Sequence, residues 1–153
     1  MAGSLYRPRG IVIHCSDSRG GDVGIVGNWH RKRGFSGFGY HFLITNGRSL
    51  DSSLSFLPEL HEDGRINAGR YVGDSVMEEG AHARGYNTTH IGICLVGQDG
   101  VFTERQLGSL RFLCKKLMSH FGLKVSGVIG HYEVNSNKTC PDLDMDEFRR
   151  ELS

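Results

Sequence analysis

The sequence predicts a single α/β domain in which helices cover both faces of a sheet. Two observations lead to this fold class: short apolar runs rich in β-branched residues, and amphipathic segments that lie between them. A chain of 153 residues that is 38% hydrophobic can bury one core and needs no second domain. We therefore expect residues 1–153 to form one domain, with residues 1–10 as an N-terminal extension.

Four segments have the composition of buried strands. The clearest covers residues 11–16, where a β-branched apolar run is followed by polar residues and glycine. This pattern is typical of a strand that is buried on both faces. Similar runs predict strands at residues 41–45, 90–96 and 124–129.

Three further segments predict helices. Thr103 can cap a helix with Gln106 three residues later, apolar residues then recur at steps of three and four, and Gly122 supplies the stop. A second capped helix is expected to begin at Asp144, and a weaker one covers residues 25–33. Helices that alternate with strands in this way favour a sheet covered on both sides.

Residues 51–63 follow neither the helical nor the strand period. Serines and Pro58 surround a few apolar side chains in this stretch. A long irregular connection is typical either of a binding loop or of an insertion with a small apolar cluster of its own. We expect an insertion loop that contains one helical turn.

The composition argues against several classes of function. Lys and Arg number 18 against 17 Asp and Glu, so the formal net charge of +1 produces no long-range field for nucleic acid. No stretch approaches the roughly 18 apolar residues that a membrane span requires, and residues 1–10 lack the apolar core of a secretory signal. We therefore expect no nucleic-acid partner, no membrane span, and a protein that stays in the cytoplasm after synthesis.

The four cysteines contain no C-x-x-C pair, which favours reduced thiols over a disulfide framework. Cys94 lies inside an apolar strand and Cys114 on the apolar stripe of a helix, so both are expected to be small buried side chains. Strand alternation places Cys15 on the face opposite His14, so we expect Cys15 to take no part in a site with that histidine.

Three other residues form a candidate metal site. His14 ends its apolar run and His131 follows another, so both imidazoles are expected at the carboxyl ends of neighbouring strands. Cys140 lies in a polar loop close to His131 in the sequence. Two histidines and one cysteine leave the fourth tetrahedral position of zinc open, as in catalytic zinc sites. The residues alone leave open the alternative that both histidines are hydrogen-bonded structural side chains.

Several segments resemble a known family. They follow the family's order from residue 11 to the C-terminal helix and cover nearly the whole chain. Through them the chain resembles the amidase-type endolysins of phages, which are zinc-dependent N-acetylmuramoyl-L-alanine amidases and share their fold with peptidoglycan recognition proteins. The segments are residues 11–16, 28–30, 39–42, 80–87, 91–97 and 131–134 with 138–141.

The resemblance implies a fold, a cofactor and a set of site residues. The fold is a central mixed, mainly parallel sheet of about five strands with helices on both faces. The cofactor is one zinc ion per chain, with His14, His131 and Cys140 as its ligands. Tyr40 and Lys138 are implied to be the catalytic pair.

Other positions in the matched segments have implied roles or differ from the family pattern. The resemblance implies that His82 lines the substrate groove. The loop over residues 131–140 is slightly longer than in the family, and residues 51–63 look like an insertion that would alter substrate contacts. Glu133 is a candidate partner for a ligand histidine and is left without a catalytic role.

The resemblance also implies an activity and partners. The activity is hydrolysis of the amide bond between N-acetylmuramic acid and L-alanine in peptidoglycan, by an endolysin that accumulates in the host cytoplasm and reaches the wall after the membrane is breached. A phage RNA polymerase is a candidate protein partner, and we expect a monomer. Two alternatives are a peptidoglycan-binding module without activity and a cysteine hydrolase that uses Cys140 with His131.

Overall fold

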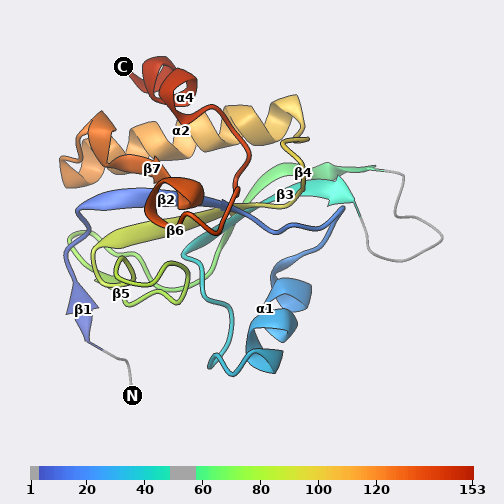
Figure 1. Cartoon of the computed structure of the whole chain (residues 1–153), viewed down its shortest axis with the longest axis horizontal. Helices are drawn as coiled ribbons and strands as arrows, with labels where there is room; N and C mark the ends of the chain where they lie inside the picture. The colour runs from blue at the N-terminus through green and yellow to red at the C-terminus, as the bar shows by residue number, and fades with distance from the viewer. Residues whose placement is uncertain (1–3, 49–57) are drawn as a thin grey trace.

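The computed structural model describes residues 4–48 and 58–153 and confirms the predicted α/β architecture. A five-stranded mixed sheet in the order β4-β3-β6-β2-β7 lies between helices, and a separate two-stranded sheet pairs β1 with β5 (Figure 1). The strands are β1 (Leu5–Tyr6), β2 (Gly10–Cys15), β3 (Phe42–Arg48), β4 (Pro58–Ala68), β5 (Met77–Glu78), β6 (His90–Leu95) and β7 (Val128–Gly130). The helices are α1 (Val23–Lys32), α2 (Glu104–Phe121), α3 (His131–Val134) and α4 (Met145–Leu152), with a 3₁₀ turn at Val125–Gly127.

Strand β2 lies inside the sheet, between β6 and β7, and runs parallel to both. All six of its residues are buried, as the continuous apolar run predicts. Strand β3 is also parallel to β6, whereas β4 pairs with β3 in the antiparallel direction at one edge. The sheet is therefore mainly parallel, and the carboxyl ends of β2, β6 and β7 lie at the same edge.

The two faces of the sheet are covered by different helices. In Figure 1, α2 and α4 lie on one side of the sheet and α1 lies on the other. The larger apolar core forms between the sheet and the α2–α4 layer and includes Ile13, Leu110 and Phe148. A smaller cluster, which includes Val26 and Cys94, forms on the α1 side. Cys94 and Cys114 are both fully buried, as expected.

Helix α2 begins and ends where the sequence predicts. The Thr103 side chain accepts from the Gln106 N–H, the Gln106 side chain accepts from the Thr103 N–H, and Gly122 ends the helix with φ 66°. Gln106 has a second role that the sequence does not reveal. Its buried side-chain amide donates to the carbonyls of Ile44 and Val96, at 3.0 and 2.8 Å, and so joins the start of α2 to two strands.

The prediction that residues 51–63 form an insertion loop is wrong for residues 58–63. Residues 58–63 belong to β4, which pairs with β3 from Arg48↔Pro58 to Phe42↔Ala68. The register shifts on both sides of Asn46, so the alternation that would identify a strand is interrupted. Residues 51–57 lie outside the described part of the chain.

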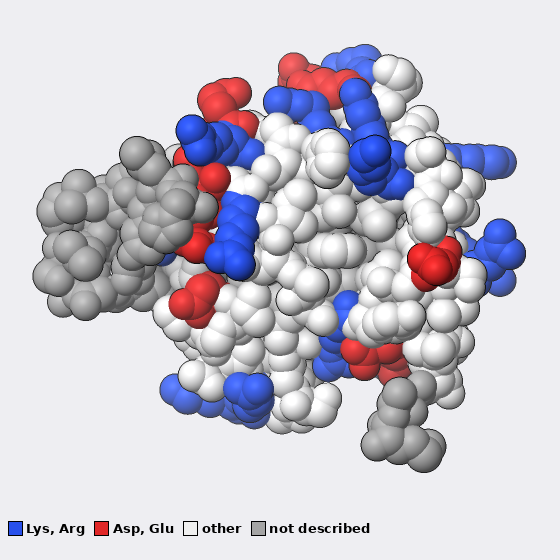
Figure 2. All heavy atoms as spheres, turned by 180° about the vertical axis from the view of Figure 1, so that it is seen from behind, with Lys and Arg blue, Asp and Glu red and all other residues white. Residues whose placement is uncertain are grey.

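Charge is not concentrated on the face that Figure 2 shows. Basic and acidic side chains alternate around the rim of this face, and its centre is uncharged. This distribution agrees with the nearly neutral composition. Among residues 4–48 and 58–153, no helix has the length and apolar character needed to cross a membrane.

We predict that the Gln106 bridge makes a large contribution to stability. Gln106→Leu keeps most of the side-chain volume but removes both donors to the sheet and the acceptor for the Thr103 N–H. Loss of buried partners should lower the free energy of unfolding by about 2–4 kcal/mol in urea denaturation. Gln98→Leu, at a partly exposed glutamine, is the control and should change it by less than about 0.5 kcal/mol. Equal effects of the two changes would disprove the bridging role.

Candidate functional site

The register between β2 and β7 brings His14 and His131 together. Ile13 pairs with Gly130 in this parallel ladder, so the residues that follow them, His14 in β2 and His131 at the start of α3, lie side by side. The Nδ1 atoms of the two histidines are 3.1 Å apart, and the ring centroids are 4.4 Å apart. The prediction that both imidazoles emerge at neighbouring strand ends is confirmed.

Cys140 completes a group of three potential metal ligands. Its loop returns to the sheet, where the Tyr132 N–H donates to the Cys140 carbonyl at 2.9 Å. One donor atom from each of His14, His131 and Cys140 lies within 4.8 Å of the others. In residues 4–48 and 58–153 this is the one group of three or more His, Cys, Asp or Glu side chains with that proximity.

Cys15 contacts this group, which corrects the expectation that it takes no part. Its backbone N–H donates to the Cys140 Sγ at 2.7 Å. Strand alternation predicts the direction of a side chain but not the contacts of the backbone, which lies within reach of both faces. Contact with the Cys15 thiol, together with burial, raises the pKa of Cys140.

The electrostatic environment keeps the two histidines neutral. Burial lowers the pKa of His14 well below its ordinary value, and the neighbouring His82 and His131 lower it further. Burial also lowers the pKa of His131, with a second contribution from the positive charge of Lys138. Neutral imidazoles have a free lone pair, which is the form that binds a metal ion.

Tyr40 lies against the group, as expected for a member of the site. Its ring centroid is 5.0 Å from that of His14 and 5.1 Å from that of His30. Burial raises the pKa of Tyr40 well above its ordinary value, so its hydroxyl stays protonated and can donate a hydrogen bond.

His30 supports the Tyr40 segment, and sequence reasoning gave it no role. The side chain is buried, and its Nδ1 accepts from the Gly39 N–H at 2.8 Å. A side chain at Gly39 would clash with the carbonyl of Ala81, so glycine is required at this approach. The segment 28–30 belongs to the family pattern, which was the available signal for His30.

Lys138 lies in the loop between His131 and Cys140. Its side chain is exposed, and its backbone N–H donates to the carbonyl of Asn135 at 3.0 Å. Its positive charge contributes to the lowered pKa values of His14 and His131, in each case as a smaller cause than burial. Lys138 stays a candidate for the site through its place in this loop, between two of the potential metal ligands.

His82 lies behind His14. Its Nδ1 is 2.9 Å from the His14 Nε2, and its Nε2 is 3.0 Å from the carbonyl oxygen of His90. Burial lowers the pKa of His82 to about 3, with a smaller contribution from His41, so the ring is neutral near pH 7. The structure brings His82 to the site, with both ring nitrogens in contact with protein groups.

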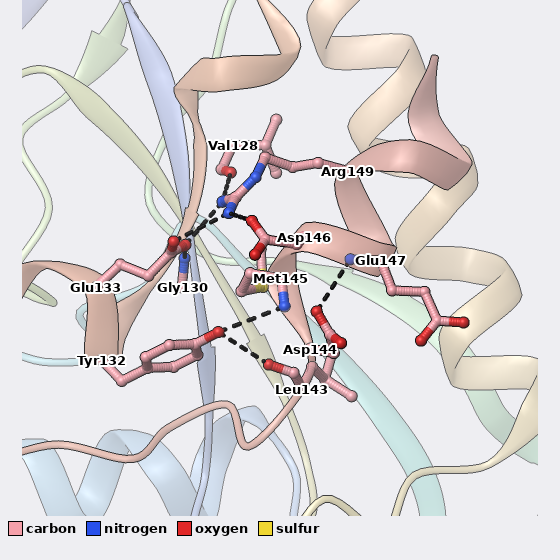
Figure 3. Close-up of polar contacts among 10 residues, drawn as sticks. All are labelled: Val128, Gly130, Tyr132, Glu133, Leu143, Asp144, Met145, Asp146, Glu147 and Arg149. Carbon is pink, nitrogen blue, oxygen red and sulfur yellow. Dashed lines mark hydrogen bonds and ion pairs between the residues drawn. The ribbon is translucent and has the colours of Figure 1, made fainter.

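Helix α4 anchors the short helix that carries His131 (Figure 3). Both carboxylate oxygens of Glu133 accept from the Arg149 guanidinium, at 2.7 and 3.0 Å, and one also accepts from the Gly130 N–H at 2.9 Å. Arg149 also donates to the Val128 carbonyl in β7 and to Asp146. The partners of Glu133 are therefore Arg149 and the start of α3, and not a ligand histidine.

Tyr132 forms a second link between α3 and the segment that leads into α4. Its hydroxyl donates to the Leu143 carbonyl at 3.1 Å and accepts from the Met145 N–H at 3.3 Å (Figure 3). Asp144 caps α4 by accepting from the Glu147 N–H, as predicted. These contacts hold both ends of the loop that carries Lys138 and Cys140.

A cavity of about 540 Å³ lies elsewhere, between the start of α1 and strands β3 and β4. It is lined by glycines, Asp22, Thr45 and the charged side chains Arg48, Glu62 and Arg65, without a histidine or cysteine. The Asp22 carboxylate caps α1 at Ile25 and so places a negative charge at the helix N-terminus. The histidine and cysteine chemistry favours the group around His14 as the functional site.

Comparisons with known proteins relate the chain to amidases and endolysins. A family model described as N-acetylmuramoyl-L-alanine amidase matches residues 4–142. The endolysin of Enterobacteria phage T3 is 32% identical over an alignment 159 residues long. The alignment covers 95% of this chain and 90% of the relative. The endolysin of Escherichia phage T7 is 34% identical over 147 residues, with coverages of 88% and 81%.

Solved structures of an amidase and of peptidoglycan recognition proteins are also similar to this chain. An N-acetylmuramoyl-L-alanine amidase from Clostridium intestinale is similar over 99% of this chain and 91% of its own, with a TM-score of 0.76 and 26% identity. A complex of the peptidoglycan recognition proteins LCa and LCx with tracheal cytotoxin matches 92% of this chain and 79% of the other, with a TM-score of 0.66 and 25% identity.

We predict that Arg149 stabilises the fold through its contacts with Glu133 and β7. Arg149→Leu removes a bidentate ion pair and a hydrogen bond to the Val128 carbonyl, and should lower the free energy of unfolding by about 1–3 kcal/mol. Arg150→Leu is the matched control, because Arg150 is exposed on the same helix. In urea denaturation the control should change by less than about 0.5 kcal/mol. Indistinguishable variants would show that the anchor contributes nothing.

Proposed function

Because this chain belongs to the N-acetylmuramoyl-L-alanine amidase family and is therefore an amidase, we propose that it works with one zinc ion held by His14, His131 and Cys140. The bond cleaved is the amide between N-acetylmuramic acid and L-alanine of peptidoglycan. The observation that carries the proposal is the convergence of two neutral imidazoles and one thiol, whose donor atoms lie within 4.8 Å of one another.

The donor set fits zinc in both chemistry and spacing. Tetrahedral zinc with bonds of about 2.0–2.3 Å separates its ligand atoms by about 3.3–3.7 Å. The Nδ1 atoms of His14 and His131 are 3.1 Å apart, so only a small increase in this distance is needed for both to bind one zinc ion. The Cys15 N–H that donates to the Cys140 Sγ would stabilise a thiolate at that position.

Three protein ligands leave one position for water or substrate. When bound, zinc would lower the pKa of a coordinated water and polarise the amide carbonyl of the substrate. The protein's own contribution here is orientation: β2 and the start of α3 hold the two imidazoles, and the loop between α3 and α4 holds the thiol.

Lys138 and Tyr40 are proposed to act on the reacting amide. The mobile ammonium group of Lys138 can approach the carbonyl oxygen, where negative charge develops during attack by water. The Tyr40 hydroxyl stays protonated and can donate to the same oxygen or orient the attacking water. Neither side chain belongs to the proposed ligand set, so neither is needed to bind the metal.

The biological role that we propose is that of an endolysin. The relatives from phages T3 and T7 carry that description and align over most of both chains. Action on the bacterial wall follows from the peptidoglycan amidase activity. The expected RNA polymerase contact and the monomeric state stay predictions.

The two alternatives from the sequence are less favoured. A binding module without activity does not need three potential metal ligands and Tyr40 to converge at one site. A cysteine hydrolase needs a thiolate, but contact with the Cys15 thiol raises the pKa of Cys140. Activity that persists in the presence of a strong chelator would favour the cysteine hydrolase.

We predict that Cys140→Ala loses both zinc and hydrolysis. Wild-type protein should bind one zinc ion per chain and release muropeptides with new L-alanine amino termini but no new reducing sugar ends. Cys140→Ala should bind no zinc at micromolar concentrations while it keeps its circular dichroism spectrum. Cys114→Ala, in the core of α2, is the matched control and should retain both properties. New reducing ends from the wild type would identify a glycosidase and reject the proposal.

We also predict that Lys138→Met and Tyr40→Phe lower kcat without loss of zinc. Each change removes a group that is proposed to stabilise charge in the transition state, so kcat should fall by roughly 10²-fold. Lys124→Met, at an exposed lysine away from the site, serves as the control for the loss of charge. Zinc stoichiometry and single-turnover rates check the result. A decrease in zinc content that matches the decrease in rate would assign these residues to metal binding instead.

A further inference from the structure

The position of His82 suggests a role that differs from contact with substrate. The residue lies in the segment between β5 and β6, and its ring meets that of His14 nearly edge-on, with centroids 5.0 Å apart and an interplanar angle of 89°. One ring nitrogen contacts His14 and the other contacts the His90 carbonyl. Neither nitrogen is left for a peptidoglycan group.

Packing fixes this orientation of the ring. Glycines lie on two sides of it: a Cβ at Gly92 would be 2.6 Å from the ring carbons of His82, and a Cβ at Gly80 would clash with the ring. The backbone on the other side is also held, because the N–H groups of His82 and Ala83 both donate to the Asn87 side chain, at 2.8 and 2.9 Å. The ring is therefore packed closely against the backbone at Gly80 and Gly92, and its own backbone segment is held by Asn87.

The hydrogen bonds determine which nitrogen carries each proton. The His90 carbonyl can only accept, so the proton of the neutral His82 ring must lie on Nε2. The His82 Nδ1 then has a lone pair and must accept from His14. His14 therefore carries its proton on Nε2, and its Nδ1 lone pair faces the Nδ1 of His131 at 3.1 Å.

We propose that His82 is a positioning residue that holds His14 in the Nε2–H tautomer and directs its Nδ1 lone pair toward the metal position. The inference rests on the proposed function, because it assigns His82 to the same metal site. In this arrangement the His90 carbonyl determines which nitrogen of His82 is protonated. His82 in turn determines which nitrogen of His14 is protonated. This role replaces the substrate contact that the family resemblance implied for His82.

His41 provides a useful contrast within the same cluster. Its Nδ1 accepts from the Gly92 N–H at 3.0 Å, and its Nε2 donates to the Glu78 carbonyl at 2.8 Å. Both partners are backbone groups, so His41 joins strands and holds no ligand. His82 differs because one of its two partners is a proposed metal ligand.

A pair of matched variants separates positioning from packing. In His82→Asn the amide oxygen can take the place of Nδ1 and accept from His14, but the bond to His90 is lost. In His82→Gln the amide nitrogen can take the place of Nε2 and donate to His90, but no acceptor remains for His14. Both variants remove the ring, so their difference reports on the acceptor for His14.

We expect the zinc Kd, measured by chelator competition, to rise by about 10–100-fold in His82→Gln, the usual effect of losing a hydrogen-bond partner of a metal ligand. In His82→Asn it should rise by less than about fivefold. Urea denaturation of the metal-free proteins reports any shared loss of packing separately. A zinc Kd for His82→Gln that equals the wild-type value, or is lower than that of His82→Asn, would overturn the proposal.

The tautomers can also be read directly in the wild-type protein, which needs no variant to fold. Long-range ¹H–¹⁵N correlation spectra of the zinc-loaded protein should show His14 and His82 each protonated at Nε2. A His14 proton on Nδ1 would overturn the proposal even if zinc binds and peptidoglycan is cleaved. A wild-type protein that binds no zinc would instead reject the proposed function, and this inference with it.

Discussion

The parallel pairing of β2 with β7 is the constraint on which the rest of the site depends. Because Ile13 lies opposite Gly130, the next residue along each chain segment is a histidine, His14 in β2 and His131 at the start of α3, and the two rings lie side by side. A register shift of one residue would turn His14 to the opposite face of the sheet. The burial of β2 on both faces fixes its register, so the apolar core specifies the spacing of the ligands.

Hydrogen bonds convert this spacing into a defined geometry. The proposed ligand His14 contacts His82, the loop thiol of Cys140 accepts from the Cys15 N–H, and Arg149 holds α3 against β7. In residues 4–48 and 58–153 no buried side-chain nitrogen or oxygen is left without a hydrogen-bond partner. Side chains that are already oriented lose little freedom when a metal or substrate binds, which favours both affinity and catalysis.

The sequence was most informative where a signal is local. The apolar run of β2, the capping box at Thr103 and the polar segment with Cys140 each predict their own structure from a few adjacent residues. The family pattern added Tyr40 and Lys138, which periodicity could not have selected. The structure places the Tyr40 ring against that of His14, and Lys138 lies in the loop between His131 and Cys140.

Features that depend on distant partners could not be predicted in this way. His82 and His14 are 68 residues apart, and only the fold shows that the second nitrogen of His82 meets a carbonyl. The Arg149 anchor joins two helices whose charges resemble ordinary surface residues in the sequence. The first part of β4 was missed because its pairing with β3 shifts in register at Asn46.

X-ray absorption at the zinc edge of the metal-loaded protein tests the ligand set most directly. Two imidazoles and one thiolate should give one sulfur scatterer at about 2.3 Å and nitrogen or oxygen scatterers at about 2.0–2.1 Å, with the multiple scattering typical of two histidines. Zinc surrounded only by nitrogen and oxygen would exclude Cys140 from the site and refute the proposed metal centre.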